Sequence, residues 1–135
     1  MRKALCVLLF VLVSLPAAAL YPLLQSTASQ EVEIYLVDAT DHLSAELGIT
    51  TPTITIKKKG GNWIAPSDGT WYEPTPGNGV YTVMLDATDT NTVGPLVVHV
   101  AKAGCDNFRA ACHVRAKSEA QIYSDMAPAS TALST

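Results

Sequence analysis

The stretch from residue 80 to residue 101, VYTVMLDATDTNTVGPLVVHVA, decides the fold of this chain. Residues 80–85 alternate in character, as in a β-strand with one buried face. Residues 96–101 are apolar on both faces, which is typical of a strand in the middle of a sheet. A polar loop separates the two strands, so the stretch indicates an all-β protein. The expected core residues of its first strand are Tyr81, Val83 and Leu85.

Five more segments have the residue types of short β-strands bounded by turns. Residues 31–37, EVEIYLV, alternate polar and apolar side chains, and residues 53–57 do the same. The turn sequence KGGN at 59–62 predicts a hairpin, because glycine tolerates the positive φ that tight turns require. The remaining expected strands are 63–64, 70–73 and 111–115. The expected core residues of these segments are Val32, Ile34, Leu36, Ile54 and Ile56.

Six to seven short strands with frequent turns predict an all-β fold, an antiparallel immunoglobulin-like β-sandwich. A small β-barrel is the alternative. We expect the 135 residues to divide into four segments. These are an apolar signal-like segment at 1–19, an extended lead-in arm at 20–30, the β-sandwich domain at 31–116 and a loose, flexible tail at 117–135. Residues 119–126 could form a helical turn or two within this tail.

The first 19 residues have the layout of a secretory signal peptide. A basic start, Met1-Arg2-Lys3, precedes the uncharged run ALCVLLFVLVSL at 4–15, and three alanines follow Pro16. The apolar run is shorter than a membrane-spanning helix requires. A membrane anchor and an upstream extension from a misplaced start stay open as alternatives. Cleavage near Ala19 would give a secreted or periplasmic protein that contacts a membrane only before processing.

Composition and motifs exclude several classes of function. Hydrophobic residues make up 48% of the chain and charged residues 16%, with a net charge of −3. Such a chain can build a core, but it has no basic excess for nucleic acid. The histidines at 42, 99 and 113 are scattered, and no sequence motif of a hydrolase, zinc protease or phosphate-binding loop is present. We expect a non-enzymatic protein without a cofactor.

The segment Asp-Ala-Thr-Asp occurs twice, at 38–41 and 86–89, each time directly after an expected strand. Aspartate side chains accept hydrogen bonds from backbone N–H groups two residues further on, which predicts two strand-ending turns. If both loops met at one end of the sandwich, their oxygens could instead bind calcium, which takes six to eight oxygen ligands. The candidate calcium ligands are Asp38, Asp41, Asp86, Asp89 and Asn91.

Two cysteines, Cys105 and Cys112, follow the leader, whereas Cys6 lies within it. A Cys105–Cys112 disulfide is allowed in an oxidising compartment. Two free, half-buried thiols are the alternative, because cysteine is among the most buried residue types.

Aromatic residues cluster around two turns. The candidates for contact with a ligand or partner are Trp63, Trp71 and Tyr72. An outward ring could stack on a sugar, whereas inward rings would fill the core. Trp71 and Tyr72 are adjacent, so in an extended strand one faces inward and the other outward.

Six motifs follow one another along the chain: STASQ at 26–30, DATD at 38–41, ELGIT at 46–50, KGG at 59–61, GVY at 79–81 and DATDTNTVGPL at 86–96. Their order, from about residue 24 to residue 115, resembles a small β-sandwich module of tailed-bacteriophage virion and prophage proteins. The resemblance implies a virion-associated structural protein of the tail, neck or capsid surface. We expect it to pack against other virion proteins and copies of itself, with residues 1–30 as a docking arm, because a hydrophobic segment retained in the mature protein must be buried. The alternative is a secreted or cell-surface module that binds glycan or protein.

Overall fold

The computed structural model describes residues 21–74 and 78–126. The predicted signal-like segment 1–19, its cleavage point and the last part of the predicted tail, 127–135, lie outside the described residues. Within the described part, no helix has the length and apolar character needed to cross a membrane.

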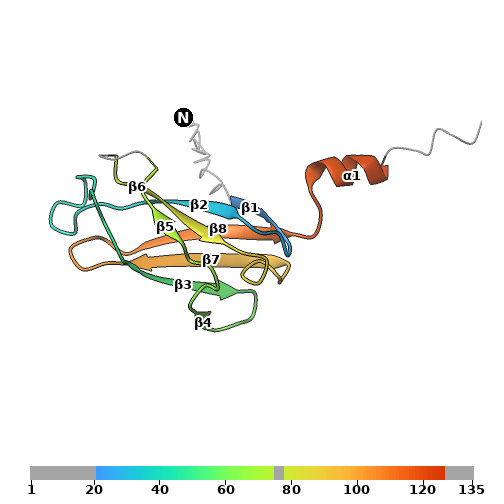
Figure 1. Ribbon diagram of the computed structural model, residues 1–135, viewed down its shortest axis with the longest axis horizontal. Coiled ribbons are helices and arrows are strands. Elements are labelled where there is room, and N and C mark those ends of the chain that lie inside the picture. Colours follow the sequence, from blue (N-terminus) through green and yellow to red (C-terminus); the bar gives the residue numbers. More distant parts are fainter. Residues whose placement is uncertain (1–20, 75–77, 127–135) are drawn as a thin grey trace, which may run out of the picture.

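Eight strands and one helix follow one another along the described chain (Figure 1). They are β1 (Tyr21–Leu24), β2 (Gln30–Tyr35), β3 (Thr53–Lys58), β4 (Trp63–Ile64), β5 (Trp71–Tyr72), β6 (Val80–Leu85), β7 (Gly94–Ala101), β8 (Phe108–Arg115) and α1 (Glu119–Met126). The predicted strands are all present within a few residues of their expected bounds.

The strands form two sheets. The five-stranded sheet has the order β1-β8-β7-β3-β4, and the three-stranded sheet has the order β2-β6-β5. Neighbouring strands are antiparallel except β1 and β8, which are parallel. Strand β7 lies in the middle of its sheet, as its apolar sequence predicted. The result is an all-β sandwich of two sheets.

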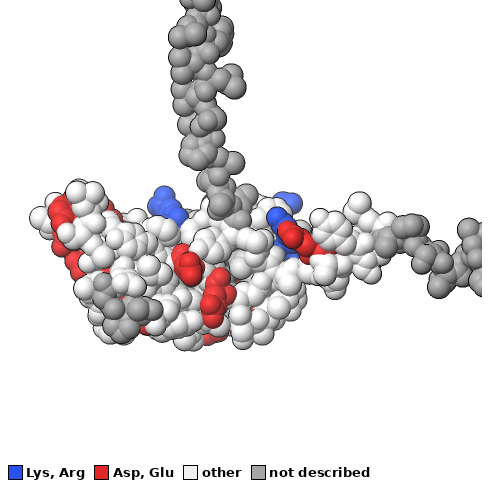
Figure 2. All heavy atoms as spheres, turned by 90° about the horizontal axis from the view of Figure 1, so that it is seen from above, with Lys and Arg blue, Asp and Glu red and all other residues white. Residues whose placement is uncertain are grey.

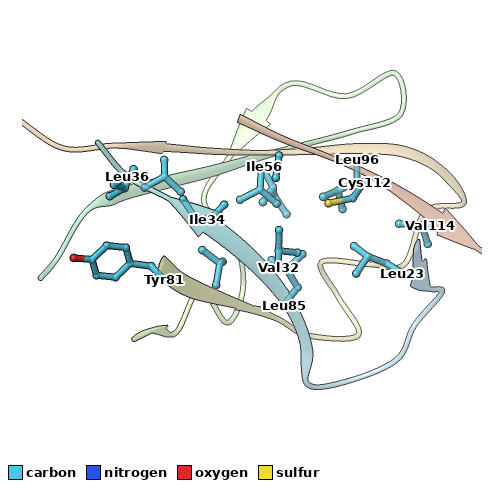
Figure 3. Close-up of a cluster of buried hydrophobic side chains, with 14 of the residues drawn as sticks. Leu23, Val32, Ile34, Leu36, Ile56, Tyr81, Leu85, Leu96, Cys112 and Val114 are labelled. Atoms are coloured by element: carbon cyan, nitrogen blue, oxygen red, sulfur yellow. The ribbon is translucent and has the colours of Figure 1, made fainter. Parts of the chain in front are cut away.

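The core lies between the sheets and takes side chains from both (Figure 3). Alternation along β2 buries Val32 and Ile34, and Leu36 follows them into the core. Ile56 is fully buried, whereas Ile54 packs against the core from a partly exposed position. The expected core residues are therefore confirmed, and period-two alternation explains why.

Strand β1 differs from the prediction of an extended arm ahead of the domain. Its backbone pairs with β8, and Leu23 is only 3% exposed within the core. The side chain of Gln30 accepts a hydrogen bond from the Leu24 N–H and donates one to the Leu24 carbonyl at 2.7 Å. Residues 21–24 thus belong to the sandwich. The sequence did not predict this strand, because a segment of four residues that includes Pro22 shows no clear alternation of polar and apolar side chains.

Helix α1 spans residues 119–126, for which the sequence allowed a helical turn or two within the predicted loose tail. Ser118 caps its first turn, because its hydroxyl accepts the Gln121 N–H at 3.2 Å and the Gln121 side chain accepts the Ser118 N–H at 2.9 Å. This reciprocal pair is a capping box. No residue of α1 is buried, and the helix projects beyond the end of the sandwich (Figure 1).

Candidate functional site

Both Asp-Ala-Thr-Asp segments form the same turn. The Asp86 carboxylate accepts the N–H groups of Thr88 at 2.7 Å and Asp89 at 2.9 Å. The Asp38 carboxylate accepts the equivalent N–H groups, of Thr40 and of Asp41, the second at 3.3 Å. These bonds stabilise the ionised carboxylates and lower the pKa of both aspartates. The interpretation as strand-ending turns agrees with this geometry.

The two turns lie at opposite ends of the three-stranded sheet. Strands β2 and β6 are antiparallel, with Gln30 opposite Leu85 and Tyr35 opposite Val80. The turn after β2 therefore lies at one end and the turn after β6 at the other, about 17–20 Å apart at the usual rise per residue. A joint calcium site is wrong for this reason, and among the described residues no cluster of His, Cys, Asp or Glu could hold a metal ion.

The remaining calcium candidates near β6 are occupied by contacts within the fold. Asp89 is 2% exposed and accepts N–H groups from Ser67 at 2.7 Å and Asp68 at 3.3 Å. It thereby fixes the loop before β5 to the loop after β6. The Asn91 side-chain oxygen accepts a hydrogen bond from the Lys58 ammonium at 3.1 Å. Asp89 thus joins two loops, and Asn91 joins the loop after β6 to the end of β3.

At the other end, the loop after β2 meets the loop between β7 and β8. The Asp106 N–H donates to the Val37 carbonyl at 2.9 Å, and the His42 ring lies 2.7 Å from the Asp106 carboxylate. That contact raises the pKa of His42. Hydrogen bonds, chiefly from the Ser44 hydroxyl, lower the pKa of Asp41 to about 2. Figure 2 shows acidic side chains at this end of the sandwich, and further acidic groups over the middle of the same face and beside α1.

The adjacent aromatic residues of β5 face opposite ways, as predicted. Trp71 stacks on Tyr81 with ring centroids 4.6 Å apart, and its indole N–H donates to the Ile49 carbonyl at 2.8 Å. Tyr72 is exposed. Beside them lies an open hollow of about 440 Å³. Its lining residues are Gly48, Ile49, Thr50, Thr51, Trp71, Tyr72 and Glu73. An aromatic wall with hydroxyl and carboxyl groups suits a sugar or a short peptide.

The third aromatic candidate, Trp63, lies elsewhere. It belongs to β4, at the edge of the five-stranded sheet, and its ring centroid lies 5.7 Å from that of His99. β4 and β5 belong to different sheets, so the structure does not assemble Trp63, Trp71 and Tyr72 into one site.

Cys105 and Cys112 are free and buried, so of the two alternatives the structure has free thiols rather than a disulfide. Cys112 lies inside β8, and Cys105 precedes that strand. Cys105 lies opposite Asp38 in an isolated β-bridge, whereas Cys112 lies opposite Leu96 in the pairing of β7 with β8. Burial raises the pKa of the Cys112 thiol to about 12.

The outer faces of the two sheets carry opposite charges, which sequence reasoning missed. Every charged residue in the strands of the five-stranded sheet is basic, namely Lys57, Lys58, Arg109 and Arg115. Every charged residue in the strands of the three-stranded sheet is acidic, namely Glu31 and Glu33. Lys57, Arg109 and Arg115 are exposed and define the basic face, whereas exposed Glu31 and Glu33 define the acidic face.

The sequence shows directly which strands carry basic residues and which carry acidic residues. The grouping of these charges into two faces could not be predicted from the sequence, because it depends on which strands share a sheet.

In comparisons with known proteins, no family model, no curated protein and no solved structure matched this chain.

Proposed function

We propose that this chain is a non-enzymatic, virion-associated structural protein that acts through protein–protein packing. The observation that carries the proposal is the pair of oppositely charged sheet faces. A flat sheet surface with one sign of charge suits a protein partner of complementary charge, since such complementarity steers encounter and fixes register. The virion setting rests on the resemblance of residues 24–115 to phage β-sandwich modules.

We further propose that the sandwich is immunoglobulin-like. The strand order supports this proposal: β2, β6 and β5 form one sheet, and β8, β7, β3 and β4 form the other. In variable-type immunoglobulin domains, strands B, E and D face strands G, F, C and C′ in the same arrangement. A fold of this kind serves many functions, so it supports the packing role without specifying it.

Several side chains that could carry chemistry are engaged by the fold itself. Asp38 and Asp86 cap turns, Asp89 joins two loops, and the Trp71 indole N–H binds a backbone carbonyl. Their polar atoms stabilise loops, which favours a structural role for them over a role in binding small ligands. The sheet faces are then the surfaces through which we expect the protein to act.

Peptide mass spectrometry of purified extracellular particles from the source tests the proposal. We expect peptides of this chain in the particle fraction, in stoichiometric amounts after density-gradient purification. The N-terminal peptide also tests the signal-like segment: a start near Met1 supports the docking arm, and a start at Leu20 supports cleavage. Absence from particles, with recovery in the soluble secreted fraction, would overturn the virion proposal.

The hollow beside β5 favours a second candidate function, a secreted or cell-surface module that binds glycan. Tyr72 and Trp71 supply aromatic surface, and Thr50 and Glu73 supply polar groups at its wall. A glycan array with the full chain tests this alternative, with Tyr72→Ala as the variant expected to lose binding. Trp63→Ala is the matched control, because Trp63 lies on the other sheet.

A further inference from the structure

We propose that copies of this chain associate front to back, with the basic face of one copy lying on the acidic face of the next. This inference rests on the proposed packing function and names the partner as a second copy. The two faces lie on opposite sides of one sandwich, so each copy offers both complementary surfaces. A contact between unlike surfaces can repeat from copy to copy, into a ring or an open stack.

The basic face combines cations with apolar and aromatic side chains. Lys57 lies opposite Val97 in the pairing of β3 with β7, and Val97 lies opposite Ala111 in the pairing of β7 with β8. Paired residues in neighbouring strands share one face of a sheet. Val97 and Ala111 therefore lie on this face together with His99, which is opposite Arg109, and the exposed Trp63, which is opposite Lys57. Lys57 and Arg109 are the exposed cations among them.

Arg115, the third cation of the basic face, is partly neutralised by its ion pair with Glu119 at 3.3 Å. Lys57 and Arg109 have no such acidic partner among the ion pairs of the described residues. We therefore expect these two residues to supply most of the attraction to an acidic surface.

The carboxylates of the acidic face are held in place by tyrosines. The Tyr72 hydroxyl donates to Glu31 at 3.1 Å from across the three-stranded sheet. The Tyr21 hydroxyl donates to Glu33 at 3.2 Å from β1 of the other sheet. A carboxylate already fixed by a hydrogen bond loses less side-chain freedom when a partner binds. These bonds leave acceptor capacity for a cation, since each carboxylate accepts several hydrogen bonds.

The same charges disfavour the alternative pairings. Two basic faces repel each other, and so do two acidic faces, so a symmetric face-to-face dimer is opposed by like charges. Front-to-back association is the arrangement in which unlike faces meet. Because exposed charges are screened within about 10 Å at 0.1 M salt, the association should weaken as salt is added.

Charge reversal with the full chain tests this geometry by sedimentation velocity. One variant carries Glu31→Lys and Glu33→Lys, and the other carries Lys57→Glu and Arg109→Glu. Each alone has two faces of the same sign and should associate about tenfold or more weakly than the unmodified chain. Mixed together, the variants again offer unlike faces and should associate. Lys102→Glu with Lys117→Glu is the matched control, because these lysines lie outside the strands.

The expected result is concentration-dependent association of the unmodified chain and of the control at about 20 mM salt, reduced at about 500 mM. Monomers at every concentration in low salt would overturn the inference, and so would a variant mixture that stays monomeric. Circular dichroism checks that each variant folds. If the variant with Glu31→Lys and Glu33→Lys does not fold, the variant with Glu31→Gln and Glu33→Gln is used in its place. The particle experiment is independent: a chain abundant in particles but monomeric in solution leaves the proposed function standing and removes this inference alone.

Discussion

Asp38 and Asp86 hold the same turn geometry at opposite ends of the sandwich. Each begins an Asp-Ala-Thr-Asp segment and accepts the N–H groups two and three residues further on. The local sequence dictates the turn, and the antiparallel pairing of β2 with β6 dictates the separation. Their equivalence ends at the last residue of each segment, because Asp89 is buried whereas Asp41 is exposed.

Replacing Asp89 should destabilise the protein more than replacing Asp41. Asp89→Ala leaves the N–H groups of Ser67 and Asp68 without their acceptor in a part-buried loop. Unsatisfied donors of this kind cost about 2–3 kcal/mol of unfolding free energy. Urea unfolding measures the loss, with Asp41→Ala as the exposed control. Equal losses for the two variants would contradict the role given to Asp89.

Calcium should not stabilise the protein. Asp38 and Asp86 are too far apart to share an ion, and each carboxylate already accepts two backbone N–H groups. A ligand that binds only the native state raises the melting temperature, so we expect a change of less than about 1 °C between millimolar calcium and chelator. Differential scanning fluorimetry gives the answer, with magnesium as the control ion. A rise specific to calcium would show that one turn binds the ion alone.

Tyr81→Phe should loosen the loop between β2 and β3. The Tyr81 side chain is fully buried, and its hydroxyl accepts the Ile49 N–H at 3.0 Å and donates to the Glu46 carbonyl at 2.8 Å. Removing the hydroxyl should cost about 1–2 kcal/mol and speed hydrogen exchange at Ile49. Tyr72→Phe is the matched control, because its hydroxyl is exposed and should cost less. Unchanged hydrogen exchange at Ile49 would contradict the role of the Tyr81 hydroxyl in holding this loop.

The thiols should stay unmodified in the folded protein. Burial raises the pKa of Cys112 from 9.0 to about 12, and the thiolate is the reactive form. We expect alkylation by iodoacetamide at pH 8 only after denaturation, at both Cys105 and Cys112, as measured by mass spectrometry without reductant. Resistance after denaturation would instead indicate a disulfide, and Cys105→Ser would then expose Cys112.

The burial of Cys112 makes the free energy of unfolding depend on pH in the alkaline range. A folded-state pKa above the unfolded value means that the neutral thiol is favoured by folding. The contribution of the Cys112 thiol to the free energy of unfolding is therefore fully present below pH 9.0 and is lost as the pH rises toward about 12. Cys112→Ser removes this thiol titration, so urea unfolding of both proteins across the range isolates its contribution.

At acidic pH, His42 should stabilise the contact between the loop after β2 and the loop between β7 and β8. Its pKa is raised above 6.5, chiefly by the hydrogen bond to Asp106. The contribution is fully present below 6.5 and is lost as the pH rises through the folded-state pKa. His42→Ala should lower the melting temperature at about pH 5.5 more than at about pH 8.5. Asp106→Asn should give the same pattern, whereas a pH-independent loss would show that the ring acts by packing.

Local pattern predicted much of the strand content but not every strand. Alternation identified β2 and its inward residues Val32 and Ile34, because period-two patterning reports burial directly. It missed β1, because Pro22 interrupts a segment of only four residues whose pairing partner, β8, lies far along the chain. It allowed a helical turn or two at 119–126 but missed the capping box at Ser118, which begins α1.

The sequence by itself determined the positions of strands β2 to β8, the KGGN hairpin and the two aspartate turns, because backbone φ preferences and side-chain alternation act over a few residues. Only the tertiary structure decided that Asp38 and Asp86 are apart, that Cys105 and Cys112 stay unbridged, and that Lys57 and Arg109 share a face opposite Glu31. Each of these relations depends on which distant strands pair, and that choice is made by packing the whole core rather than by any local residue pattern.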